Sequence, residues 1–214
     1  MQAKLQRQQA MTDARRALVL DAARAVFADA GIEGASIREI AKRAGYTPGA
    51  IYSYFDSKEA IYAALLDESL ARLCTTVAEA KVSRNAPPRT LAAKAQAWFD
   101  FYAAHPRDLD LGFYLVHGMR PRGLNNELDH ALNDRLREAL QPCEDALQAM
   151  GLDSQRALQE NTALFAHGVG LLLMRHTGRI RMFGQSAEDL FKRYVDQLVA
   201  RVKAEAADPI GGTV

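Results

Sequence analysis

Apolar residues recur every three or four positions along most of the chain, the spacing of one buried face of an α-helix. No stretch alternates apolar and polar residues over the length of a strand, so we predict an all-α fold. Residues 1–11, with four Gln, predict a frayed arm. Pro142 is expected to kink or divide one helix. About nine helices are predicted, over residues 12–30, 37–44, 48–54, 57–82, 89–105, 108–118, 124–150, 154–176 and 186–206, with residues 85–88 as a loop.

The segment over residues 36–58, SIREIAKRAGYTPGAIYSYFDSK, predicts two short helices joined by a tight turn. Ser36 stands three positions before Glu39, which is capping-box spacing: the Ser side chain accepts from the Glu39 amide, and Glu39 reaches back. Gly45 ends the first helix, and the Thr-Pro pair at 47–48 starts the second, because Thr caps a helix and Pro at its first position loses no hydrogen bond. Two such helices joined by a short turn that contains a Gly match a helix-turn-helix.

The second short helix has the composition of a surface that meets DNA. Gly49, Ala50 and Ser53 are small, so the backbone can approach base edges and thymine methyl groups closely. Tyr52 and Tyr54 offer hydroxyls to phosphates. The candidate DNA-binding residues are Ser36 and Arg38 at the flanking backbone, Gly49, Ala50 and Ser53 at the bases, and Thr47, Pro48, Tyr52, Tyr54 and Lys58 at the phosphate side.

These motifs resemble those of the TetR family of transcriptional regulators. The resemblance rests on FADAG at 27–31, SIREIAKRAG at 36–45, TPGAIYSYF at 47–55 and SKEAI at 57–61, and it covers about the first 60 to 65 residues. It implies a three-helix DNA-binding head followed by a helical body that binds an effector and dimerises. We therefore expect a DNA-binding domain over residues 1–56, an effector-binding and dimerisation domain over 57–207, and a tail over 208–214.

The last two predicted helices are the expected dimer surface. On the final helix, apolar residues repeat at a spacing of four, three and four positions, a seam that suits either the core of one subunit or an interface. The resemblance favours an interface of two helices from each subunit, and a two-fold dimer presents two recognition helices to half-sites about one DNA turn apart. The candidate dimer residues are Phe165, Gly168, Leu172, Phe191, Val195, Leu198 and Val202.

Aromatic residues gather in the body and mark a candidate small-molecule site, although the same residues also suit a core. A cavity lined by aromatic side chains with a few polar groups is typical of such sites. Among these residues, Tyr and His are the better candidates for ligand contacts, because a buried polar group needs a hydrogen-bond partner. The candidate ligand-binding residues are Trp98, Phe101, Tyr102, Phe113, Tyr114, His117, Phe165 and His167, and the effector is unknown.

The charge and the composition of the chain limit the classes of protein to which it can belong. The net charge of +1 excludes a broadly cationic surface, so DNA binding would depend on a local patch. The sequence contains no apolar stretch long enough for a signal peptide or a membrane span. We therefore expect a cytoplasmic protein without a membrane partner. The 2 cysteines and 5 histidines show no metal-ligand spacing, so neither a metal nor a cofactor is expected.

The chain lacks the motifs of common enzymes, including a nucleophile elbow, an HExxH helix and a phosphate loop. We therefore expect that the protein is not an enzyme. We expect a homodimeric repressor that binds a palindromic operator in double-stranded DNA and is released by a small-molecule effector. The alternative is a helical protein-interaction scaffold, which would have no use for a capped helix-turn-helix with hydroxyls at phosphate-facing positions.

Overall fold

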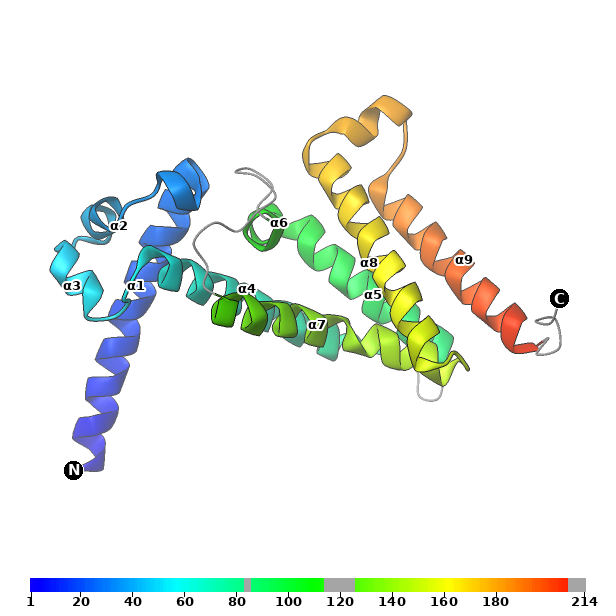
Figure 1. The fold of residues 1–214 in the computed structure, drawn as a ribbon, viewed down its shortest axis with the longest axis horizontal. Helices are drawn as coiled ribbons and strands as arrows, with labels where there is room; N and C mark the ends of the chain where they lie inside the picture. Colours follow the sequence, from blue (N-terminus) through cyan, green and yellow to red (C-terminus); the bar gives the residue numbers. More distant parts are fainter. Residues whose placement is uncertain (83–85, 114–125, 208–214) are drawn as a thin grey trace. The chain divides into compact units, whose positions relative to one another are not determined.

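The computed structural model describes residues 1–82, 86–113 and 126–207. Over these ranges the chain forms nine α-helices, one short 3-10 helix and no strand, which confirms the predicted all-α fold (Figure 1). The chain divides into two compact units: a head unit, Met1–Ser69 with Arg107–Asn133, and a body unit, Leu70–Pro106 with Asp134–Val214.

The head unit is built around the second half of its first helix. Val19, Ala23 and Phe27 are buried on α1, and the Phe27 ring meets the Tyr62 ring edge-on at a centroid distance of 5.5 Å. This apolar stripe supports the two short helices that follow it in sequence. The helices of this unit are α1 (Gln2–Gly34), α2 (Ile37–Ala44), α3 (Pro48–Tyr52), the first half of α4 (Lys58–Glu79) and α6 (Pro106–Phe113).

The predicted arm over residues 1–11 is wrong, because α1 begins at Gln2. This segment consists of Gln, Ala, Lys, Leu, Arg and Met, which are strong helix formers, and no Gly or Pro separates it from the buried turns behind it. Adding a residue to an existing helix is much easier than starting one, so the helix extends outward although its side chains are exposed. Gly31 interrupts the helical geometry as predicted, with φ 66° and ψ 177°, and one more turn ends at Gly34.

The two predicted caps of the helix-turn-helix are present. The Ser36 hydroxyl accepts from the Glu39 amide at 3.2 Å and donates to the Glu39 carboxylate at 3.0 Å. The Thr47 hydroxyl accepts from the Ala50 amide at 3.3 Å. Between them, Gly45 takes the left-handed conformation with φ 74°, which a residue without Cβ adopts at little cost.

The helix α3 is shorter than predicted and ends at Tyr52 rather than residue 54. The Ser53 amide donates to the Ala50 carbonyl and the Tyr54 amide to the Ile51 carbonyl, three positions back in both cases. This tighter pattern is common where an α-helix ends, and it turns the chain toward α4.

The body unit is packed around aromatic rings of α5 and α9. The Phe99 and Phe191 rings stack with centroids 4.3 Å apart, and Trp98 lies between Tyr102 and Phe165 with edge-on contacts to both. Its helices are the second half of α4, α5 (Pro87–Ala104), most of α7 (Asn126–Ala149), α8 (Ser154–His176), the 3-10 helix η1 (Arg179–Phe183) and α9 (Ala187–Ala207). Pro142 lies inside α7 and does not divide it.

Lys94 of α5 is a buried cation that holds the end of α4. Its Nζ donates to the backbone carbonyls of Val77, Ala78 and Ala80 at 2.8, 2.8 and 3.1 Å. The last carbonyls of a helix lack partners within the helix, and the helix dipole is negative there, so an ammonium group stabilises this end. Burial also raises the pKa of the Cys143 thiol to about 12, although the charge of Lys94 opposes this rise.

Gly168 of α8 is the tightest point of this core. A Cβ at this position would lie 2.5 Å from Trp98 Cζ3 and 3.0 Å from Phe191 Cε2, whereas a Cβ at Gly170 meets nothing within 4 Å. We expect Gly168→Ala to lower the free energy of unfolding by about 1–3 kcal/mol through overpacking. Gly170→Ala should instead raise it by up to about 1 kcal/mol, since Ala is the better helix former.

Urea unfolding followed by the fluorescence of Trp98, the only Trp, measures both variants at one protein concentration. Equal stability of the two variants would contradict the packing at Gly168.

Candidate functional site

The candidate DNA-binding residues lie together on the helix-turn-helix of the head unit. All of them are exposed or half-buried, and Tyr52 is 55% exposed. Ile51 of α3 is fully buried and Phe55 is 4% exposed, so these two side chains fix the inner face of the segment. The outer face is left with the small and hydroxyl-bearing residues.

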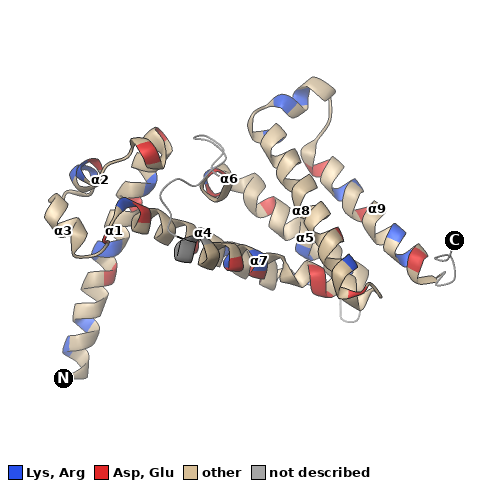
Figure 2. Ribbon diagram, viewed as in Figure 1, with Lys and Arg blue, Asp and Glu red and all other residues tan. Residues whose placement is uncertain are grey.

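The charges of this surface lie around α3 rather than on it. The sequence of α3, PGAIY, contains no charged residue, whereas α2 carries several (Figure 2). Arg43 pairs with Asp29 at 3.2 Å, but Arg38 and Lys42 have no ion pair among the described residues. Lys42 was not among the predicted residues, although its spacing of four from Arg38 places both on one side of α2.

Lys58, predicted at a phosphate, binds backbone carbonyls within the head unit. Its Nζ donates to the Glu33 carbonyl at 3.3 Å and the Ala35 carbonyl at 3.2 Å, so two of its three donors are already used. Arg16 is engaged in a similar way: Nη1 donates to the Tyr54 carbonyl at 3.3 Å, and Cζ lies 4.2 Å from the centroid of the Phe55 ring.

The residues expected at a dimer interface are mostly core residues of one subunit. Gly168 faces Trp98, and the seam on α9 packs toward α5 and α8. These predicted residues are buried within one subunit: Gly168, Leu172, Phe191, Val195, Leu198 and Val202. Their place at a dimer interface stays a prediction. Phe165 is half-buried against the Trp98 ring.

The face of α8 that points away from this core has an unusual composition. From Asn161 to Met174 the helix contains no Asp, Glu, Lys or Arg. Its exposed positions within this stretch carry small or apolar side chains, namely Thr162, Ala163, Ala166, Gly170 and Leu173. We call these five residues the α8 face.

The candidate ligand-binding residues come from both units and from outside the described ranges. Trp98 and Tyr102 are buried in the aromatic core, and the Trp98 indole N–H has no partner among the described residues. Phe113 belongs to the head unit and is half-buried. Tyr114 and His117 lie outside the described residues.

His167 lies apart from that aromatic core. Its ring stacks on Tyr194 of α9 with centroids 4.2 Å apart. Burial lowers the pKa of His167, since the charged imidazolium is poorly solvated there.

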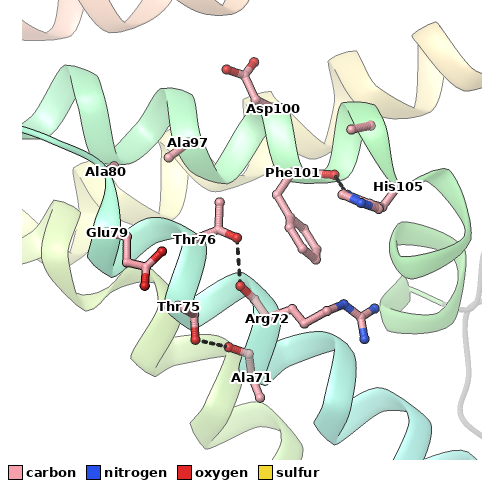
Figure 3. A pocket seen from close by; sticks show the side chains of 11 residues that line it. Ala71, Arg72, Thr75, Thr76, Glu79, Ala80, Ala97, Asp100, Phe101 and His105 are labelled. Carbon is pink, nitrogen blue, oxygen red and sulfur yellow. Dashed lines mark hydrogen bonds between the residues drawn. The ribbon is translucent and has the colours of Figure 1, made fainter.

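Phe101 is the predicted ligand residue that lines an open space. A groove of about 860 Å³ lies between α4 and α5 in the body unit (Figure 3). Alanines and the Phe101 ring form its apolar part, and charged or polar groups come from both helices. Its lining residues are Ala71, Arg72, Thr75, Thr76, Glu79, Ala80, Ala97, Asp100, Phe101, Ala104 and His105.

Sequence reasoning missed most of the groove because it looked for aromatic clusters. The available signal was the spacing of small residues, with Ala97 and Ala104 on either side of Phe101 along one face of α5. The two Thr hydroxyls on the opposite wall already donate within α4, Thr75 to the Ala71 carbonyl and Thr76 to the Arg72 carbonyl.

The described ranges contain neither a metal-binding cluster nor a membrane-spanning helix. No group of three or more His, Cys, Asp or Glu side chains in them is arranged to hold a metal ion. None of their helices combines the length and the apolar content that crossing a membrane requires.

The head matches known regulators at the level of sequence. The family described as bacterial regulatory proteins, tetR family, matches residues 19–65. The transcriptional repressor AcnR of Corynebacterium diphtheriae is 42% identical over 65 residues, which are 30% of this chain and 34% of AcnR. The transcriptional activator FasR of Mycolicibacterium smegmatis is 37% identical over 89 residues, 42% of this chain and 41% of FasR. The matched segments thus span less than half of either relative.

Most of the chain has the fold of solved regulator structures. A regulatory protein of the tetR family from Rhodococcus RHA1 superposes with a TM-score of 0.66 at 22% identity, covering 88% of this chain and 96% of that protein. At this identity the likeness shows the fold alone, and the sequence match of the head points to the same family. Over residues 19–65 the chain is similar to the TetR family of bacterial regulatory proteins.

Proposed function

We propose that the chain is a transcriptional regulator that binds a palindromic operator as a homodimer and responds to a small-molecule effector. The observation that carries this proposal is the capped helix-turn-helix, whose buried Ile51 and Phe55 leave a small, uncharged surface on α3 facing outward. The relatives do not decide between repression and activation, since one is named a repressor and the other an activator. We favour repression, released by the effector, in the cytoplasm where bacterial DNA lies.

In this proposal α3 enters the major groove. Gly49, Ala50 and Ser53 approach the base edges, and Tyr52 donates its hydroxyl to a phosphate. Arg38 and Lys42, which have no ion pair among the described residues, supply the cationic contacts beside it. Ser36, Thr47, Pro48 and Tyr54 lie at the borders of this surface.

Selection from random double-stranded DNA, followed by mobility-shift titration at several salt concentrations, tests the proposal. We expect a palindromic sequence. A Cβ at Gly49 meets nothing within 4 Å, so Gly49→Leu should fold normally yet weaken binding to that operator by about 1–3 kcal/mol per half-site. Arg38→Ala should weaken operator and unrelated DNA alike and reduce the salt slope by about 0.9 per half-site.

If the wild-type protein selects no sequence and binds DNA only weakly at low salt, the operator-binding function is wrong. The interaction scaffold would then be the better description.

The α8 face supports the homodimer. It is exposed and free of charge along more than three helical turns, and its small side chains allow two helices to approach closely. A two-fold axis through this face would pair α8 with the partner's α8, with the charged outer face of α9 beside it.

Ala166→Glu should dissociate the dimer, because it places an unpaired carboxylate in the middle of a desolvated interface. Ala10→Glu makes the same change on the exposed part of α1 and should leave the dimer intact. Sedimentation equilibrium of both variants gives their oligomeric states. If the Ala166→Glu protein is still a dimer, the interface does not lie on the α8 face.

The groove between α4 and α5 is our candidate effector site. Its apolar part and its polar rim suit a small amphiphilic molecule. α4 is one uninterrupted helix with residues in both units, so it is the candidate coupler. An effector shifts the protein only if it prefers the state that does not bind DNA.

Thr75→Trp places a large ring in the groove at an exposed position of α4. Once a screen for compounds that release the operator has found an effector, this variant should need at least about tenfold more of it, because the ring occupies its volume. Operator affinity without effector should stay unchanged. Lys192→Trp, on the exposed side of α9, is the control, and equal sensitivity of the two variants would exclude the groove.

A further inference from the structure

Two cations of the head unit bind backbone carbonyls at the two ends of the helix-turn-helix. Lys58, the first residue of α4, donates to the carbonyls of Glu33 and Ala35, immediately before the cap of α2. Arg16 of α1 donates to the carbonyl of Tyr54, immediately after α3. The entire helix-turn-helix, residues 36–54, lies between these two points.

Both contacts are made where a helix ends. The Glu33 carbonyl belongs to the last turn of α1, and Tyr54 follows the last turn of α3. Carbonyls at such ends lack helical partners and carry the negative end of the helix dipole, which attracts a cation. Arg16 gains further attraction from the face of the Phe55 ring, which is itself 4% exposed.

Neighbouring cations of the same unit are bound differently. Arg24 pairs with the carboxylates of Asp21 and Glu68, and Arg43 pairs with that of Asp29. These contacts join side chains and hold no backbone of the helix-turn-helix. Among the cations with described partners in this unit, Arg16 and Lys58 are therefore the pair placed to control its backbone.

We propose that Arg16 and Lys58 are positioning residues that clamp the two ends of the helix-turn-helix and so set the orientation of α3 for its operator. The proposal rests on the proposed DNA-binding function. It also assigns Lys58 a role different from a phosphate contact. A phosphate contact releases counterions when it forms, whereas a clamp acts on DNA only through the protein backbone.

The difference can be measured with the full-length protein. We expect Arg16→Ala and Lys58→Ala each to weaken operator binding by about tenfold or more, with the salt slope unchanged. A phosphate contact would instead lower the slope by about 0.9 per half-site. Lys58→Arg should restore binding, while Arg16→Lys should restore only part of it, because Lys lacks the planar group that stacks on Phe55.

Hydrogen exchange of the free protein gives a readout that needs no DNA. The amides of Tyr54 and Phe55 both donate to the Ile51 carbonyl, and the Ala35 amide donates to the Gly31 carbonyl. Arg16→Ala should speed exchange over residues 51–55, and Lys58→Ala over residues 33–40, by about tenfold. Arg24→Ala, the matched control, should change neither exchange region nor operator affinity.

A reduced salt slope with unchanged exchange would overturn the clamp and would show that these cations contact phosphates instead. Unchanged affinity and unchanged exchange would overturn it as well. Faster exchange in both variants, together with a wild-type protein that selects no operator, would support the clamp while the proposed function fails.

Discussion

A helix of five residues cannot hold its own shape, and α3 has five. Its conformation therefore depends on supports supplied from outside. Thr47 and Pro48 start it, Ile51 anchors it in the core, and Arg16 holds the carbonyl that follows it. Each support comes from the inner side or from an end, so the side chains of Ala50 and Tyr52 on the outward surface have none of these roles. This division lets the surface vary in sequence while the helix keeps its place.

The parts of the head that could be predicted are those with a local cause. Capping by Ser36 and Thr47 and the positive φ of Gly45 depend on a few neighbouring residues, and the structure confirms all three. The start of α1 could not be predicted, because an exposed polar segment becomes helical only through the helix that follows it. The same limit applies to Lys58, since its acceptors lie 23 and 25 positions earlier in the chain.

In the body, helical spacing predicted the elements but not what each face touches. The seam from Phe191 to Val202 satisfies the pattern of a core and of an interface equally, and only the structure shows that it packs against α5 and α8. The missing charge on the exposed side of α8 is visible in the sequence and is the signal on which the proposed interface depends. Aromatic content could not separate core from groove either, because Trp98 and Tyr102 fill the core while Phe101 lines the groove together with alanines.

The bonds of Lys94 have a mechanical consequence for that groove. They fasten the last carbonyls of α4 to α5 at the end where Ala80 and Ala97 lie. This end of the groove is therefore fixed, whereas Arg72 and His105 line the end farther from Lys94. A molecule that wedges the groove open would tilt the part of α4 in the body unit about Lys94, with a displacement that grows with distance from this fixed point.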